Sequence, residues 1–323
     1  MKTNYEILLE KELDSFIDKD THLLCADVSR SIACPLCGMS EKQQRELFIK
    51  RGYRFILCIE CGLIFVNPML KSEINQHLYD TSDSLKEWVN ILQTESQREF
   101  DLALYNSIAA LIRPYMETPS LSCLDISIRG GLASECTAFS SWPLYFFDFS
   151  QITRLHGQSK YPQRTFIDNF EEIVASNKRY DIVISMEAIE HFIDPVTFMR
   201  NIDMLLTDRG IYCGVLSNAE SLLVRIFGQQ APLFDGLYQK YFFHTASLRR
   251  LLENIGFEDI IFRTEIPCTH KIFSYLNNMI YAHVTPLSNQ AMRAVSALAE
   301  TQPLGYKLLF AAKKGRFQNN ARD

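Results

Sequence analysis

The feature that most constrains this sequence is an alternation of short apolar runs and helical patterns between residues 121 and 312. The apolar runs are rich in β-branched and aromatic residues, as strands are, and the segments between them carry apolar residues at helical spacing. The runs lie at 121–126, 144–147, 164–167, 180–186, 211–216, 257–262 and 306–312. Continuously apolar strands alternating with helices indicate a parallel sheet that is covered on both faces. We therefore predict an α/β fold for this part of the chain.

The composition is that of a globular protein with a sizeable core. The chain has 323 residues, of which 47% are hydrophobic, and this length suggests roughly two domains. The formal net charge of −5, from 33 basic and 38 acidic residues, gives no reason to expect a nucleic-acid partner. No apolar run approaches the roughly 18–20 residues of a membrane span. The amphipathic, acidic N-terminus does not look like a signal peptide. Of the nine cysteines, four form two Cys-x-x-Cys pairs and five are scattered in apolar surroundings, so we expect a reducing, cytoplasmic environment.

Two near copies of a Cys-x-x-Cys-Gly sequence, CPLCG at 34–38 and CIECG at 58–62, predict a metal site. Each copy pairs two thiolates with a glycine that permits the tight turn around a metal. Four thiolates in a tetrahedron favour zinc, and because no coordination position stays open, the zinc would be structural. The alternative is a redox thiol pair, but no thioredoxin-like βαβ pattern surrounds either copy. The predicted ligands are Cys34, Cys37, Cys58 and Cys61.

These patterns divide the chain into five parts. We expect an N-terminal helical segment at 1–31, a zinc ribbon at 32–69, a helical linker or cover at 70–117, the α/β domain at 118–315 and a tail at 316–323. The residues at 4–18 and 86–112 have helical spacing. A helical insert at 264–303 would cover one end of the sheet or form a dimer surface, and such inserts often carry specificity.

The stretch from 121 to 150 predicts a nucleotide-like pocket. An apolar run ends in a turn that contains Gly130 and Gly131, a short helical piece follows, and a second apolar run ends at Asp148. A turn that opens a helix presents free backbone N–H groups, and an acid at the next strand tip can accept hydrogen bonds from a ribose. The alternative is ordinary turn chemistry, which uses the same residue types.

The order of motifs resembles class I S-adenosylmethionine-dependent methyltransferases, and in particular bacterial members that carry an N-terminal zinc ribbon and often act in sugar and polysaccharide biosynthesis. The resemblance covers about residues 32–315 and rests on CPLCG, CIECGLIFVNP, LSCLDIS, FFDFS, YDIVISMEAIEHFIDP, LLTDRGIYCGVLSN and SLRRLLENIGFE. It implies a Rossmann-like, seven-stranded, mostly parallel sheet with helices on both faces, with an antiparallel last strand, preceded by a small zinc-ribbon domain.

The resemblance also implies where S-adenosylmethionine would bind. Asp125 and the turn through Gly131 would lie under the methionine and ribose. Asp148 would hold the ribose hydroxyls, and Asp168 with Asn169 would sit near the adenine. Four residues at the end of the 180–186 strand would face the reacting methyl group and the acceptor, namely Met186, Glu187, Glu190 and His191.

One departure from the family pattern concerns the glycine-rich turn. Its three glycine positions here read Ser127, Arg129 and Gly131, although glycine lets the backbone approach the cofactor closely. Arg129 could point outward without effect, bind an anionic group of substrate or product, or fill the cofactor pocket. The sequence leaves all three alternatives open.

For the chemistry, His191 is the leading candidate for a general base, because imidazole titrates near neutral pH. Glu190 could orient it, although helix capping and packing also explain this pair of residues. Tyr238 and Tyr241 could line an acceptor pocket or simply belong to the core. Relatives often place a histidine close to the acceptor, at the position where this chain has Phe242. His244 lies two residues further on, which weakens its assignment as a base.

We therefore predict S-adenosylmethionine-dependent methyl transfer to a small polar acceptor, most reasonably a sugar or nucleotide-sugar intermediate. The alternative is a degenerate methyltransferase fold that no longer catalyses transfer and serves as a binding or assembly partner, since the glycine turn is broken. A nucleic-acid methyltransferase is disfavoured, because no basic stripe surrounds the cysteines. The expected partner is a small molecule, with neither nucleic acid nor membrane, and the chain could form a homodimer.

Overall fold

The computed structural model describes residues 3–116, 121–266 and 301–315, together with residues 290, 293, 294, 297 and 298. Most of the predicted insert at 264–303 and the tail at 316–323 lie outside the described residues, including the aromatic residues of 273–283. No helix in the described ranges is long and apolar enough to cross a membrane.

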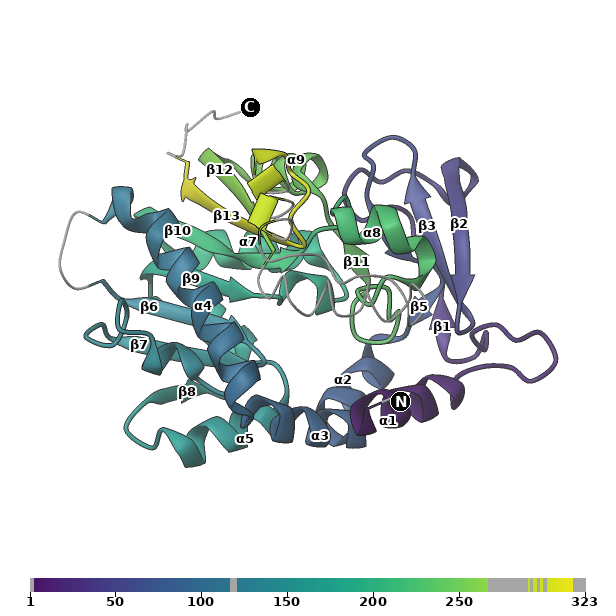
Figure 1. Ribbon diagram of the computed structural model, residues 1–323, viewed down its shortest axis with the longest axis horizontal. Helices are drawn as coiled ribbons and strands as arrows, with labels where there is room; N and C mark the ends of the chain where they lie inside the picture. The colour runs from purple at the N-terminus through teal and green to yellow at the C-terminus, as the bar shows by residue number, and fades with distance from the viewer. Residues whose placement is uncertain are drawn as a thin grey trace.

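The main sheet has seven strands in the order β12-β13-β10-β9-β6-β7-β8 (Figure 1). The pairs from β10 to β8 are parallel, and β13 runs antiparallel to both of its neighbours. This confirms the α/β fold with an antiparallel last strand. The strands are β6 (Cys123–Ser127), β7 (Leu144–Asp148), β8 (Thr165–Ile167), β9 (Tyr180–Met186), β10 (Leu206–Ser217), β12 (Phe257–Glu265) and β13 (Lys307–Lys314).

Helices cover both faces of this sheet. On one face α4 (Glu95–Ile112) crosses the strands, and on the other α7 (Pro195–Leu205) and α9 (Thr245–Ile255) pack (Figure 1). Alternate residues of β9 enter the two cores, since Ile182 and Ile184 pack with α4 while Val183 packs with α7. Such alternation buries both faces of a central strand. The other helices here are α5 (Gln151–Lys160), α6 (Phe170–Ala175) and α8 (Leu222–Phe227).

Three helices precede the sheet and lie along its crevice. They are α1 (Asn4–Asp14), α2 (Ser72–Thr81) and α3 (Asp83–Leu92). The helical pattern predicted at 86–112 is divided in two, because the Thr94 hydroxyl accepts a hydrogen bond from Gln97 N and begins α4. The helix predicted at 4–18 ends earlier than expected, at Asp14. Sequence periodicity does not register such breaks when both halves bury the same side.

The chain changes direction across the sheet between β6 and β9. From β6 it proceeds outward to β7 and β8, and it then returns to β9 on the other side of β6. In doubly wound sheets the ligand crevice lies at the carboxyl ends of the two strands where the order reverses. The turns that follow β6 and β9 therefore flank the expected binding crevice.

The turn after β6 differs from the expectation in one respect. Gly130 and Gly131 adopt positive φ angles of 57° and 78°, but the piece that follows is a 3-10 helix of four residues, Leu132–Glu135. A single 3-10 turn aligns few backbone dipoles, so it gives little of the positive charge that an α-helix N-terminus would supply. The other 3-10 helices are η1 (Glu41–Gln43), η2 (Arg113–Tyr115), η4 (Ile189–His191) and η5 (Gly228–Gln230).

The N-terminal ribbon is a small sheet in the order β11-β4-β3-β2. It comprises β2 (Gln44–Lys50), β3 (Tyr53–Cys58) and β4 (Ile64–Val66), and its fourth strand, β11 (Tyr241–Phe242), comes from the main domain. A pair of short strands, β1 (Ser29–Arg30) and β5 (Met69–Leu70), lies beside it. Phe55 of the ribbon packs against Phe234 and Phe242, so ribbon and main domain share one core.

Candidate cofactor site and metal centre

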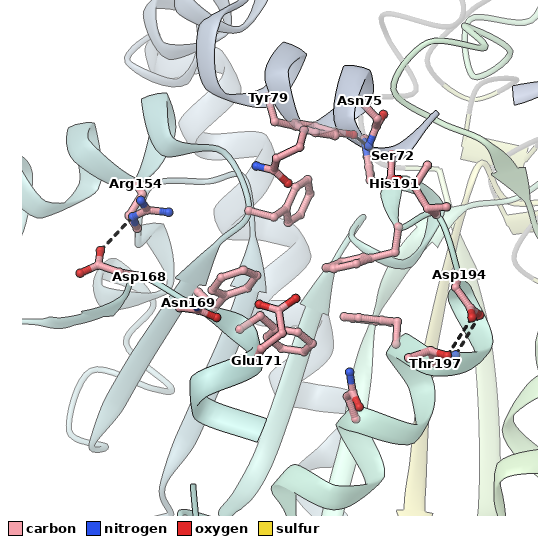
Figure 2. Close-up of a pocket in the computed structure, with 18 residues that line it drawn as sticks. Ser72, Asn75, Tyr79, Arg154, Asp168, Asn169, Glu171, His191, Asp194 and Thr197 are labelled. Atoms are coloured by element: carbon pink, nitrogen blue, oxygen red, sulfur yellow. Dashed lines mark hydrogen bonds and ion pairs between the residues drawn. The ribbon is translucent and has the colours of Figure 1, made fainter. Parts of the chain in front are cut away.

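Two cavities open at the crevice, and His191 lines both. The larger has a volume of about 520 Å³ and the smaller about 120 Å³. Figure 2 shows the larger cavity, with Tyr79 and Asn75 of α2 on one side and Asp168 and Asn169, which follow β8, on another. Both cavities therefore adjoin the loop that follows β9.

The larger cavity combines aromatic walls with a polar rim. Its rings are Phe147, Phe149, Phe170, Phe192 and Phe198, together with Tyr79. At the rim Arg154 Nε lies 3.1 Å from Asp168 Oδ1, and the Asp168 side chain is 76% exposed (Figure 2). Asn169 begins α6, and its side-chain oxygen accepts a hydrogen bond from Glu172 N at 3.2 Å. This chemistry suits a planar heterocycle between rings, with polar groups at its edge.

The smaller cavity is lined from five parts of the chain. Helices α1 and α3 contribute three of its residues, the turns after β6 and β9 contribute four, and the loop before β11 contributes three. Charged side chains make up a larger share of its lining than in the larger cavity, since two carboxylates and a guanidinium are among its ten residues. The lining residues are Tyr5, Leu85, Trp88, Ile128, Arg129, Glu187, His191, Asp235, Tyr238 and Gln239.

Arg129 points into the protein and not into solvent, with a side chain that is 3% exposed. Its Nε lies 3.0 Å from Asp101 Oδ1, and one terminal nitrogen donates to Glu187 Oε2 at 2.5 Å. The guanidinium also lies over the Trp88 ring, 5.3 Å from the ring centre. The outward alternative for Arg129 is therefore wrong, and the side chain forms part of the wall of the smaller cavity.

Glu187 lies in the turn after β9, across the switch point from Arg129. Its φ of 49° is left-handed, a conformation that costs a non-glycine residue roughly 1–2 kcal/mol. The carboxylate pairs with Lys307 as well as with Arg129. Burial would raise the pKa of Glu187, but Lys307 and Arg129 outweigh it and hold the pKa at about 2. Glu187 is therefore an anion that is neutralised by two cations.

The two acids of the β6–β7 region are buried and line neither cavity. Asp148 accepts hydrogen bonds from Gly130 N at 3.1 Å, Ser150 N at 3.2 Å and the Thr153 hydroxyl. Asp125 accepts one from the Tyr105 hydroxyl at 2.7 Å. Burial raises the pKa of each carboxyl to about 7. In this conformation Asp148 therefore closes the turn after β6, whereas the ribose role was predicted for it.

His191 is a neutral imidazole that is held by a tyrosine. Its Nδ1 lies 2.7 Å from the Tyr79 hydroxyl, and burial together with Lys240 lowers its pKa to about 3. Lys240 is itself buried, with Nζ donating to three carbonyls, one of which is that of His191. His191 is thus unprotonated at neutral pH and able to accept a hydrogen bond or a proton.

Glu190 lies behind the site and lines neither cavity. One oxygen accepts a hydrogen bond from Ser217 N at 3.2 Å, and the other has no hydrogen-bond partner among the described residues. Burial and the neighbouring Glu187 raise the pKa of Glu190 to about 8. At neutral pH it is therefore largely a protonated, buried acid.

Of the remaining predicted residues, some lie in the core and others line a cavity or join two parts of the chain. Ser127, Met186 and Tyr241 are buried in the core, and a side chain at Gly131 would meet the Phe166 ring. Tyr238 lines the smaller cavity. The ring of His244 caps α9 and lies 3.0 Å from Gly62 O of the ribbon, so this histidine fastens the two parts together.

Several site residues were missed by the sequence reading. Asn75, Tyr5, Trp88, Asp235 and Gln239 reach the cavities from segments far apart in the chain, so no local spacing connects them. Phe149 was also missed, although it directly follows Asp148, the acid that was predicted at the strand tip.

The four ribbon cysteines form a candidate metal centre. Their sulfur atoms all lie within 4.8 Å of one another. Between the two Cys-x-x-Cys copies, the Cys34 and Cys61 sulfurs are 3.5 Å apart and the Cys37 and Cys58 sulfurs are 3.4 Å apart. A zinc ion with bonds of about 2.3 Å to a sulfur tetrahedron would place the sulfurs about 3.8 Å from one another. The donor set and its spacing therefore fit a tetrahedral metal ion.

Comparison with known proteins identifies the central part of the chain. A family profile described as "Methyltransferase domain" matches residues 62–260, which is more than half of the chain. Two relatives are ubiquinone biosynthesis O-methyltransferases. The one from Dinoroseobacter shibae is 28% identical over 151 residues, which is 43% of this chain and 61% of that protein. The one from Cereibacter sphaeroides is 30% identical over 121 residues, covering 34% and 47%. The chain spans about half the length of these curated relatives.

A solved structure supports the fold. The magnesium protoporphyrin IX methyltransferase of Synechocystis PCC 6803, with bound SAH, superposes with a TM-score of 0.51 at 16% identity, covering 76% of this chain and 100% of that one. At this identity the similarity establishes the methyltransferase fold and not a shared substrate.

The buried Glu190 carboxyl generates a pH-dependence prediction. Because its pKa is raised, the folded chain keeps a proton between pH 4.5 and about 8 that the unfolded chain releases. The contribution of this group to the free energy of unfolding is therefore lost as pH rises through that window, at about 1.4 kcal/mol per pH unit. Glu190→Gln cannot ionise, so we expect its melting temperature to fall less than that of the wild type between pH 5 and pH 8.5. Calorimetry at both pH values measures this.

The matched control is Glu99→Gln, at an exposed glutamate of α4. This variant should follow the wild-type pH dependence. Parallel curves for wild type and Glu190→Gln would contradict the assignment of a raised pKa to Glu190.

Proposed function

The chain belongs to the methyltransferase domain family, and on this premise we propose that it transfers a methyl group from S-adenosylmethionine to a small polar acceptor. The observation that carries the proposal is the pair of cavities at the switch point, which share His191 as a lining residue. The larger cavity has five phenylalanine rings in its wall, and the smaller one has a guanidinium and two carboxylates among its ten lining residues. This division matches a cofactor that has an adenine at one end and an amino acid at the other.

The larger cavity would take the adenosine. Its aromatic walls offer stacking surfaces for adenine, and Asp168 and Asn169 offer oxygens and an amide at the rim. Asp148 does not line this cavity, so a ribose contact by Asp148 would require it to exchange its hydrogen bonds to the turn. The smaller cavity would take the methionine end and the reacting part of the acceptor.

S-adenosylmethionine supplies a methyl group on a positively charged sulfur, and the chain's own residues orient and deprotonate the acceptor. His191 is the proposed base. The Tyr79 hydroxyl holds its Nδ1, which leaves Nε2 as the atom that would take the acceptor's proton. Its low pKa keeps it free to accept at neutral pH but makes it a weak base. Glu190 has no place in either cavity and would act as a positioning residue through Ser217.

We propose that the acceptor is a sugar or nucleotide-sugar hydroxyl. Glu187, Asp235 and Gln239 face the smaller cavity and can accept hydrogen bonds from hydroxyl groups, and Tyr238 offers a ring surface. The named activity of the relatives, O-methyl transfer, is consistent with an oxygen acceptor.

One observation favours a second function. Arg129 stands at a glycine position of the cofactor turn and is paired with Asp101 and Glu187. If this pairing never opens, the chain would be an inactive methyltransferase fold that acts as a binding partner. Cofactor binding separates the two functions.

We further propose that the four cysteines hold a structural zinc ion. All four sulfurs serve as ligands, so the ion would have no open position for chemistry. Stabilisation of the ribbon by this ion would extend to the loop that carries His191. Val66 N of the ribbon donates to Lys240 O, and Lys240 N donates to Glu190 O in that loop.

The activity prediction combines binding with transfer. We expect calorimetry to show micromolar S-adenosylmethionine binding by the full chain, and labelled S-adenosylmethionine to methylate at least one member of a nucleotide-sugar panel. His191→Gln should lower kcat about 100-fold or more, as loss of a general base does, with cofactor affinity little changed. Absence of cofactor binding by well-folded protein would overturn the proposal, and an unchanged kcat would remove His191 from the base role.

The metal prediction is about one zinc ion per chain by elemental analysis. Chelation should lower the melting temperature, because metal binding free energy is also folding free energy. Cys58→Ser should lower zinc content, whereas Cys213→Ser, at a buried cysteine of the main sheet, should not. Protein without zinc whose four ribbon thiols are all free would refute the centre.

A further inference from the structure

The positive charge at the turn after β6 is carried by a side chain, that of Arg129. Arg129 N lies 3.3 Å from Ser127 Oγ, and Gly130 N donates to Asp148. The piece that follows is a four-residue 3-10 helix without the dipole of a longer helix. An anionic group of a ligand at this turn would thus find two of its backbone N–H groups, those of Arg129 and Gly130, already engaged. The nearest cation that lines the cavity is Arg129.

We propose that Arg129 is the residue that binds the α-carboxylate of S-adenosylmethionine, in place of the two N–H groups of this turn that are already engaged. This inference rests on the proposed function and deepens it, because it names the residue that would hold the amino-acid end of the cofactor in the smaller cavity. A guanidinium binds a carboxylate through parallel N–H donors, so it is suited to the task.

The contacts of Arg129 allow such an exchange. Asp101 Oδ1 lies beside Nε on one side of the guanidinium, and Glu187 accepts from the terminal nitrogen on the other. Asp101 also accepts from Gln97 of the same helix, at 3.0 Å. Arg129 can thus keep Asp101 while its terminal nitrogen changes partner.

Glu187 can release Arg129 without being left as an unpaired buried charge. Lys307 donates to its other oxygen and also lies 3.4 Å from Ser217 Oγ. Removing one partner from a buried ion pair is costly when the other charge is stranded, but Lys307 prevents this. The oxygen that Arg129 vacates could then accept from the α-ammonium of the cofactor. The Arg129–Glu187 pair therefore matches a zwitterion, with one charge for each of its ends.

Two ligands test the inference directly in the wild-type chain. S-adenosylmethionine and decarboxylated S-adenosylmethionine differ by the α-carboxylate alone. We expect calorimetry to show at least about tenfold weaker binding of the decarboxylated ligand, the effect of losing a charge-assisted hydrogen bond. In Arg129→Met this ratio should fall towards one, and in Arg129→Lys it should lie between, since lysine keeps the charge but not the fork.

Arg154→Met is the matched control, because this arginine lines the larger cavity, away from the amino-acid end. It should alter the affinity for both ligands alike and leave their ratio unchanged. The comparison of ligands in the wild type needs no variant, so misfolding of Arg129→Met would not remove the test.

The other outcomes are distinguishable. Equal binding of both ligands by the wild type would overturn the inference and leave the proposed function standing. No binding by the wild type but binding by Arg129→Gly would also overturn it, because Arg129 would then block the site. No binding of either ligand by any well-folded variant would overturn the proposed function and the inference together.

Discussion

The ion pair between Arg129 and Glu187 is the interaction on which the rest of the site depends. It joins the turn after β6 to the turn after β9, and these two turns flank the switch point of the sheet. Lys307 of β13 and Asp101 of α4 complete the network. Four elements are thereby held around one buried set of charges. Because every charge has an opposite partner, the network tolerates burial that a lone charge would not.

The packing around this network explains how the N-terminal parts take part in the site. The ribbon gains a strand from the main domain, and the backbone of Lys240 links β4 to the loop that carries His191. Helices α1 to α3 supply Tyr5, Trp88 and Tyr79 to the cavity walls. A methyltransferase sheet alone would leave the crevice open on this side. The ribbon and its helices are therefore walls of the site as well as scaffold.

The sequence was sufficient for the sheet, since apolar strands and helical spacing mark its elements, and for the four cysteines, since their spacing is local. It was insufficient where long-range contacts determine how an element ends or where a side chain lies. The break at Thr94 and the 3-10 helix after Gly131 leave no mark in periodicity. Neither does the inward position of Arg129, because its partners Asp101 and Glu187 lie on other elements. The burial of Asp148 and Glu190 likewise follows from packing, which a motif does not encode.

A crystal structure of the full chain with S-adenosylhomocysteine, which retains the amino-acid end of the cofactor, tests the central claim most directly. The account predicts adenine between the rings of the larger cavity and the ligand carboxylate on Arg129. It also predicts that Glu187 remains on Lys307. A bound ligand with the Arg129–Glu187 pair intact, and its carboxylate held elsewhere, would contradict the account.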